Sequence, residues 1–111
     1  ECGAAAFFQF RAGGGAASDV ADDATAYAHR SANCSMVALG GNAERLDAAW
    51  QSLAAHTQGM YLSFDSSLRP ERIAEAFPPA ALARLRSIKA AYDPTCVFRD
   101  NFAIEPAVDA A

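Results

Sequence analysis

The side chains best suited to chemistry fall in three short segments of the chain. The first reads Tyr-Leu-Ser-Phe over residues 61–64. If this segment is a strand, Tyr61 and Ser63 point to the same face, because side chains alternate along a strand. A phenol and a hydroxyl on one face could line a polar pocket, but an ordinary half-exposed strand face has the same pattern.

The other two segments carry charged and amide side chains. His29 and Arg30 end a stretch in which small and larger residues alternate. There they could hold an anionic or polar group of a substrate, although a plain surface role also fits them. Arg99 and Asn101 follow the tripeptide Tyr92-Asp93-Pro94. The Asn101 amide can donate and accept hydrogen bonds at the edge of a heterocycle, or it can serve as a plain turn residue.

Complete catalytic motifs are absent from the sequence. It contains no Gly-x-Ser-x-Gly elbow, no P-loop, no His-Glu-x-x-His and no dinucleotide fingerprint. The three glycines at 13–15 could cradle a phosphate, but no Lys-Ser/Thr pair and no helix pattern follow them, so a bend or bulge is favoured. The histidines and cysteines show no metal-ligand spacing, and no metal site is predicted.

Composition limits the class of protein. The 111 residues are 52% hydrophobic and 20% charged, which is typical of one globular domain. The net charge of -4 and the scattered Lys and Arg residues argue against nucleic-acid binding. No apolar run approaches the roughly 20 residues of a membrane span. Three cysteines without a CxxC pair favour reduced thiols and a cytoplasmic location. No signal peptide is visible, and Glu1 in place of Met favours a fragment.

Hydrophobic periodicity predicts strands that precede and alternate with helices. Strands are predicted over residues 7–11, 24–30, 34–39 and 60–64. The first helix has Asn42 as its N-cap, carries an apolar face from Leu46 to Ala54, and ends near Gln58-Gly59. Pro70 opens a short helix to residue 77, and another follows Pro78-Pro79 and stops before Asp93-Pro94. This order predicts an α+β fold, an antiparallel sheet of about four strands with helices on one face. Residues 96–98 are expected to be extended, and the tail after Pro106 frayed.

The segment from Tyr92 to Pro106 resembles a known family signature. It reads Tyr-Asp-Pro-Thr-Cys-Val-Phe-Arg-Asp-Asn-Phe-Ala-Ile-Glu-Pro and is similar to the C-terminal pattern Y-D-P-x-N-x-F-R-x-N-Q-x-I-x-P of berberine-bridge-enzyme-like oxidases. Residues 82–89 resemble the family's helix before this pattern, and residues 61–64 resemble its Y-x-N-[FY] strand. Residues 14–16 and 24–30 resemble its G-G-A and A-T-A-[FY]-A-H-R segments. The order and spacing agree from about Phe7 to Pro106.

The resemblance implies a division into parts. Members of the family bind FAD in an N-terminal domain, and a second domain, a sheet backed by helices, covers the flavin and shapes the substrate pocket. Residues 1–92 would belong to that α+β substrate or lid domain, and residues 93–111 would form a C-terminal return segment. The implied partners are an N-terminal FAD-binding domain or chain and a small-molecule substrate.

The resemblance also implies roles for individual residues. The flavin would accept a hydride from an alcohol, sugar or amine C–H bond, and Tyr61 would assist proton removal or positioning. Ser63, Arg99 and Asn101 would lie near the cofactor, and His29 and Arg30 near the substrate. The chain departs from the family pattern at Ser63 and Cys96, where the family has Asn, and at Phe102, where it has Gln.

The sequence also fits two alternative functions. The chain could be a stand-alone α+β module that binds a ligand or forms a homodimer through its sheet, without redox activity. A small cofactor-free enzyme that uses His29 and Tyr61 is a third hypothesis. Oxidoreductase activity is expected only when the chain is joined to an FAD-binding domain.

Overall fold

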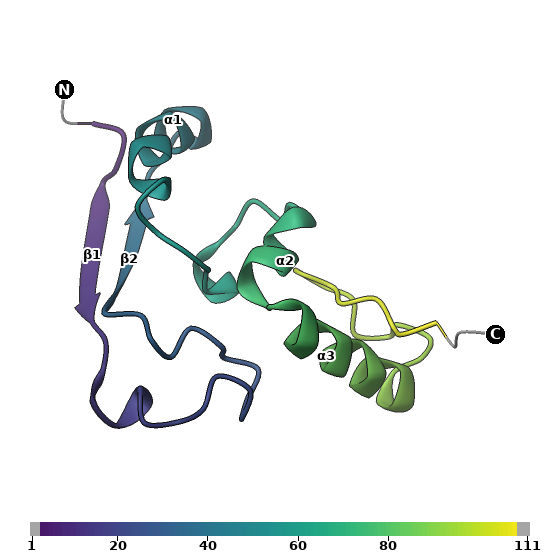
Figure 1. Cartoon of the computed structure of the whole chain (residues 1–111). Helices are drawn as coiled ribbons and strands as arrows, with labels where there is room; N and C mark the ends of the chain where they lie inside the picture. Colours follow the sequence, from purple (N-terminus) through teal and green to yellow (C-terminus); the bar gives the residue numbers. More distant parts are fainter. Residues whose placement is uncertain (1–2, 109–111) are drawn as a thin grey trace. The chain divides into compact units, whose positions relative to one another are not determined.

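The computed structural model describes residues 3–108, which form two compact units (Figure 1). The first unit comprises Glu1–Val20 and Arg30–Gln58, and the second comprises Ala21–His29 and Gly59–Ala111. Strands occur in the first unit, and two of the three helices occur in the second.

The first unit is built on a two-stranded antiparallel ladder. Strand β1 (Phe7–Ala12) pairs with β2 (Cys34–Leu39) so that Phe7 lies opposite Leu39 and Ala12 lies opposite Cys34. Both strands confirm the predictions at 7–11 and 34–39. Because side chains alternate, one face of this ladder is wholly apolar. It carries Phe8, Phe10 and Ala12 from β1, and Cys34, Met36 and Ala38 from β2.

The glycine run ends β1 and turns the chain. The Gly13 amide donates to the Asn33 carbonyl at 2.8 Å, and a Cβ at Gly13 would overlap the Ala32 carbonyl oxygen. A short 3-10 turn, η1 (Gly15–Ala17), follows. The run therefore makes the bend that its sequence favours, because only a residue without a side chain fits this close approach.

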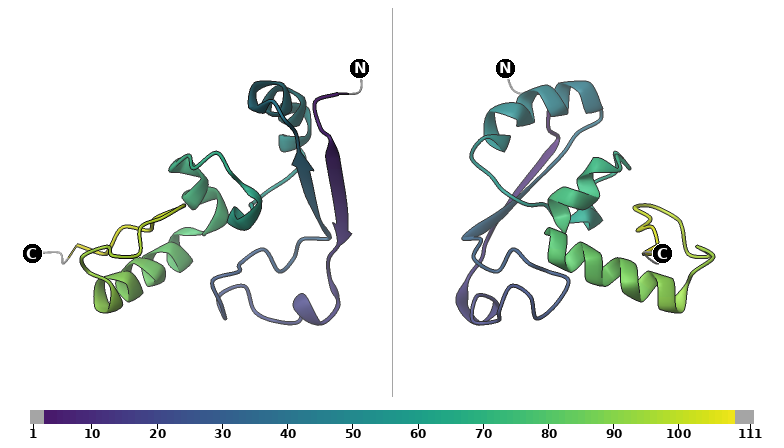
Figure 2. Two further views of the ribbon diagram at one scale, coloured as in Figure 1. Left: turned by 180° about the vertical axis from the view of Figure 1, so that it is seen from behind. Right: turned by 45° about the vertical axis from the view of Figure 1, so that its right-hand side comes forward.

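Helix α1 (Ala43–Ala54) begins at the predicted N-cap. The Asn42 Oδ1 accepts from the Arg45 amide at 2.9 Å, and Glu44 lies in the first turn, where its charge meets the helix dipole. Figure 2 shows α1 near the end of the ladder at which β2 leaves the sheet. The helix ends at Ala54, four residues before the predicted end at Gln58, because Thr57 and His56 close the last turn with i→i+3 bonds.

The second unit is helical. A 3-10 turn, η2 (Leu62–Phe64), precedes α2 (Glu71–Ala76) and α3 (Pro79–Tyr92), and α3 stops before Asp93-Pro94 as predicted. The chain then returns beside α3 (Figure 2). The Ala107 amide donates to the Arg86 carbonyl at 3.0 Å, and the expected fraying of the tail stays a prediction. Residues 109–111 lie outside the described residues.

Two predicted strands have other conformations. Residues 24–30 form turns, in which the Thr25 hydroxyl contacts the Tyr27 backbone. Residues 60–64 contain the η2 turn instead, with the Phe64 amide donating to the Tyr61 carbonyl at 3.2 Å. The extended piece expected at 96–98 contains Cys96 with a positive φ of 53°. Residues 3–108 thus hold two strands, and the sheet of about four strands is not confirmed.

The described chain buries very little of its surface. Ala76, 5% exposed, is the one buried hydrophobic residue among residues 3–108, whereas Phe10 is 61% exposed and Phe98 is 80% exposed. A two-stranded sheet is marginal in water without further packing. Apolar surface of this extent is typical of a face that packs against another domain or chain. None of the helices in the described part has the length and apolar character that a membrane crossing requires.

Candidate functional site

Tyr61 lies at the start of the η2 turn. It is the N-cap of η2 and its side chain is 58% exposed. Its ring packs against Phe64 with the ring centroids 5.7 Å apart and the planes tilted by 58°. Ser63 lies inside the same turn and is exposed. The phenol and the hydroxyl predicted to share a strand face are therefore presented to solvent by one tight turn.

His29 is held among three segments of the second unit. Its Nε2 lies 3.1 Å from the Ala76 carbonyl at the end of α2, and its ring meets Tyr27 edge-on at 6.1 Å. A carbonyl oxygen can only accept, so Nε2 carries the proton and donates. A Cβ on Gly59 would overlap the same ring. His29 thus has structural contacts, and its predicted contact with substrate stays a prediction.

Arg30 belongs to the first unit, unlike its neighbour His29. Its Nη1 donates to the Ala17 carbonyl at 3.4 Å, and its own carbonyl accepts from the Ser18 hydroxyl at 2.8 Å. Both contacts fasten the loop between η1 and β2. The predicted contact of Arg30 with substrate stays a prediction.

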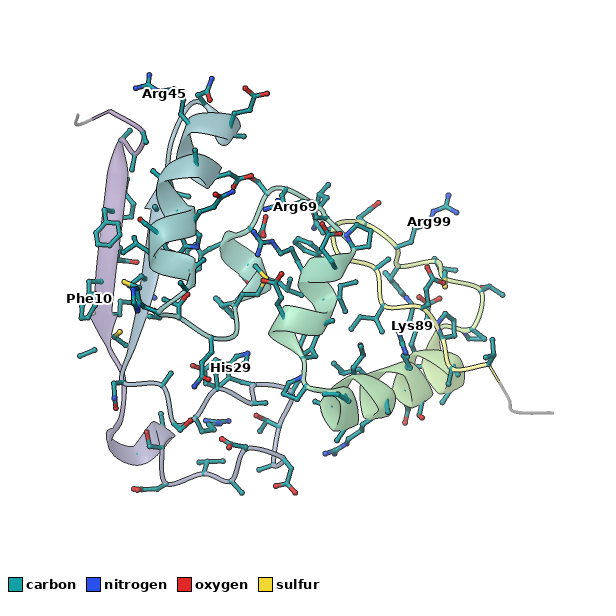
Figure 3. The ribbon with its side chains drawn as sticks, turned by 45° about the horizontal axis from the view of Figure 1, so that its top comes forward. Phe10, His29, Arg45, Arg69, Lys89 and Arg99 are labelled. Atoms are coloured by element: carbon teal, nitrogen blue, oxygen red, sulfur yellow. The ribbon has the colours of Figure 1, made fainter. Side chains whose placement is uncertain are left out.

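A network around Asp93 fixes the turn that follows α3. The Val97 and Phe98 amides donate to the two carboxylate oxygens at 2.7 and 3.1 Å. Lys89, one helical turn earlier, forms an ion pair with Asp93 and donates to the Phe98 carbonyl at 2.6 Å. We call these four residues the Asp93 network. In Figure 3 the Lys89 side chain points from α3 toward this turn. Arg99 follows the turn in the sequence, and its side chain points to solvent.

Asn101 lies beyond the Asp93 network, at the rim of a cavity. It has a positive φ of 59°, which asparagine tolerates better than most residues. The cavity has a volume of about 380 Å³ and lies between the return segment and helices α2 and α3. Leu68, Ile73 and Ile104 are among its apolar lining residues, and Arg86 and Asn101 supply polar groups. Neither Tyr61 nor Arg99 lines it.

Asp65 organises the segment between η2 and α2. Its Oδ1 accepts from the Ser67 amide at 2.6 Å, and its Oδ2 lies 3.3 Å from the Arg72 Nε. Burial alone would raise the pKa of Asp65, but the Ser67 hydrogen bonds and the charges of Arg72 and Arg69 outweigh it and leave the pKa below its usual 3.8. The pKa of Asp93 is also lowered, first by the hydrogen bond from Lys89 and then by the Val97 and Phe98 amides.

Both lowered pKa values make the second unit sensitive to acid. A carboxylate whose pKa is lower in the folded chain adds stability above its unfolded pKa of 3.8, and that stability is lost as pH falls through the folded value. We expect helix content, followed by circular dichroism, to fall below about pH 4. The Asp65→Asn/Asp93→Asn double variant should lose this acid step, because it lacks both carboxylates at every pH.

Asp19→Asn is the matched control for that titration. Asp19 is an exposed carboxylate in the turn after η1, outside both carboxylate clusters. Its variant should reproduce the acid transition of the natural chain. An acid step that survives unchanged in the double variant would show that other carboxylates cause it.

The side chains predicted to contact a flavin are exposed polar groups. Arg99, Asn101 and Ser63 are exposed donors of the kind that hydrogen-bond a heterocycle edge. The glycine run, however, leads into a three-residue turn and not into a helix whose N-terminus could hold a pyrophosphate. Among residues 3–108 no cluster of three or more His, Cys, Asp or Glu side chains could hold a metal ion. Cys34 and Cys96 are free thiols, and Cys2 lies outside the described residues.

Together, the fold and the site define an α+β segment that presents a phenol and amide donors at its surface. Residues 64–105 match the family described as berberine and berberine like. The chain is 39% identical over 56 residues to a chitooligosaccharide oxidase of Gibberella zeae, which covers 50% of this chain. It is 37% identical over 65 residues to an (R)-6-hydroxynicotine oxidase of Paenarthrobacter nicotinovorans, which covers 58% of this chain.

These matches agree with the signature at residues 92–106. Residues 64–105 are therefore a berberine and berberine-like segment, similar to part of the berberine-bridge-enzyme-like FAD-linked oxidases. The matched stretches span 11% and 14% of the length of the two relatives. The match begins at Phe64, so it includes the Asp93 network, the cavity and Asn101, and Tyr61 and His29 lie before it.

Proposed function

We propose that this chain is the C-terminal substrate-domain part of an FAD-dependent oxidoreductase, and that it is not competent alone. The observation that carries the proposal is the match of residues 64–105 to the berberine and berberine-like family, together with two relatives that are oxidases. When bound, the flavin supplies the acceptor for a hydride from a substrate C–H bond. The relatives' names point to a sugar or an amine as the substrate class.

Each part of the chain has a task in this proposal. Tyr61, exposed on η2, takes or holds a proton of the substrate during oxidation. Arg99 and Asn101, on the turn after the Asp93 network, contact the flavin held by an N-terminal FAD-binding domain or chain, and Ser63 assists from η2. The first unit, which has few buried side chains, packs against that partner through the apolar face of the β1–β2 ladder. The cytoplasmic location stays a prediction.

Flavin absorbance tests the proposal. The chain alone should purify colourless, because the glycine run does not lead into a helix that could hold a pyrophosphate. Co-expression with a flavin-binding portion encoded upstream in frame should give a yellow complex that contains both parts. A yellow preparation of the chain alone, or a flavin-loaded partner that never retains the chain, would contradict the proposal.

The alternative is a module that dimerises without redox activity, and one observation favours it. The apolar ladder face has Phe8 at 53% and Phe10 at 61% exposure, which suits self-association. Sedimentation of the chain with and without the flavin-binding portion separates the two hypotheses. A homodimer that persists in the presence of that portion supports the module, whereas a one-to-one complex supports the oxidase.

A further inference from the structure

We infer that His29 is a positioning residue, which fixes the backbone turn that presents Tyr61. The inference deepens the proposed function, on which it rests for the role of Tyr61. Its starting observation is that one imidazole ring contacts its own loop and two chain segments that are distant from it in sequence. These are the loop at Tyr27, the turn at Gly59 and the C-terminal end of α2 at Ala76.

The contact at α2 is a hydrogen bond over 47 positions of the sequence. The Ala76 carbonyl is one of the last in its helix, where carbonyls lack an intrahelical donor. Ala76 is also the one buried hydrophobic residue among those described. The His29 Nε2–H therefore supplies the donor that this helix end needs, at the best-packed point of the second unit.

The contact at Gly59 is steric. Gly59 has a φ of 69°, in the left-handed region, and its missing side chain leaves the space that the His29 ring occupies. Two constraints therefore favour glycine at this position: the left-handed backbone angles and the space taken by the His29 ring. Tyr61 follows Gly59 by two residues and is the N-cap of η2. The direction of the chain on leaving Gly59 sets the direction in which the Tyr61 phenol is presented.

Tyr27 completes the arrangement from the side. Its ring meets the imidazole edge-on, with the planes at 88°. Such edge-to-face packing holds the imidazole plane in one orientation. The ring nitrogen that faces Ala76 and the ring edge that faces Gly59 are then fixed together. A histidine that only bound substrate would not need any of these three contacts.

Fluorine NMR of the chain labelled with 3-fluorotyrosine tests the inference without any flavin. The chain has three tyrosines, so three signals report on Tyr27, Tyr61 and Tyr92. His29→Ala should shift the Tyr61 and Tyr27 signals and leave Tyr92, 86% exposed at the end of α3, in place. The Phe64 amide, bonded to the Tyr61 carbonyl, should exchange about fivefold faster. His29→Gln, which keeps a donor for Ala76, should give smaller changes.

His56→Ala is the matched control. His56 is an exposed histidine just after α1, and its replacement should leave all three signals unchanged. A His29→Ala chain whose Tyr27 signal shifts while Tyr61 and the Phe64 amide stay as they were overturns the inference. If His29→Ala unfolds the chain, so that all three signals move to the unfolded position, the inference is tested by the His29→Gln variant and by the double-variant cycle with Gly59→Ala.

The double-variant cycle with Gly59→Ala isolates the steric step. Gly59→Ala should move the Tyr61 signal strongly while His29 is present, because the new methyl group and the ring compete for one space. In a His29→Gln background the same change should move it less. Equal shifts in both backgrounds overturn the inference. Since no flavin is measured, a failed colour test of the oxidase proposal leaves this result intact.

Discussion

Replacing Tyr61 with phenylalanine should lower kcat for substrate oxidation by about 100-fold in the flavin-loaded complex. The phenol is 58% exposed on η2, and its ring contact with Phe64 does not require the hydroxyl. Tyr61→Phe thus keeps the packing and removes only the group that exchanges a proton. Because that interaction belongs to the transition state, KM should change little. Steady-state kinetics and anaerobic flavin reduction measure both quantities.

Tyr92→Phe is the control for this experiment. Tyr92 is 86% exposed at the end of α3 and has no role in the proposed reaction, so its variant should keep the kcat of the natural complex. The circular dichroism spectrum of Tyr61→Phe should match that of the natural chain. A kcat that stays within a few-fold of the natural value would remove Tyr61 from the chemistry and leave its role as surface packing.

The elements that sequence reasoning placed well are those whose local signals agree with one another. The strands at 7–11 and 34–39 combine apolar or β-branched residues with glycine breaks, and each matches β1 or β2 within one residue. Helix α1 begins directly after its N-cap Asn42, as predicted, because an N-cap side chain and a periodic apolar face indicate the same start. Prolines set the limits of α2 and α3 in the same way.

The two predicted strands that are not confirmed depend on a partner strand or on a left-handed residue. Residues 60–64 have strand propensity, but Gly59 turns the chain with a positive φ and the next residues close i→i+3 bonds. Residues 24–30 are mostly small and bury little area, so they pair with no strand. Strand propensity reflects packing against neighbours, which a sequence alone does not specify.

The site residues stay predictions, and the sequence does not predict the contacts that surround them. Arg99 and Asn101 were singled out by resemblance, yet the Asp93 network that holds their turn was not. Its local signals were present, namely Lys89 four residues before Asp93 and a proline after it. Cys96, where the family has Asn, adopts a φ of 53°. Asparagine is one of the few residues that tolerate this region, which gives the family pattern a physical reason. The hydrogen bond from His29 to Ala76 joins residues 47 positions apart, so no local sequence pattern predicts it.

Asp93→Asn should release the turn that carries Arg99 and Asn101. The carboxylate accepts from two backbone amides and pairs with Lys89, and hydrogen bonds to an ionised acceptor are roughly twice as strong as neutral ones. An asparagine has one acceptor oxygen and no charge, so it cannot replace all three contacts. We expect the Val97 and Phe98 amides to exchange about tenfold faster in native-state hydrogen exchange near pH 7.

Asp100→Asn is the control, since Asp100 is an exposed carboxylate on the same turn and outside the Asp93 network. Its variant should leave both amides as protected as in the natural chain. Acid supplies an independent check, because the lowered pKa of Asp93 means that its carboxylate is neutralised only below the usual 3.8. The natural chain and the D93N variant should therefore differ near pH 7 and converge as Asp93 is protonated. If they are equally protected at neutral pH, the backbone holds the turn without the carboxylate, and the Tyr-Asp-Pro part of the signature needs another explanation.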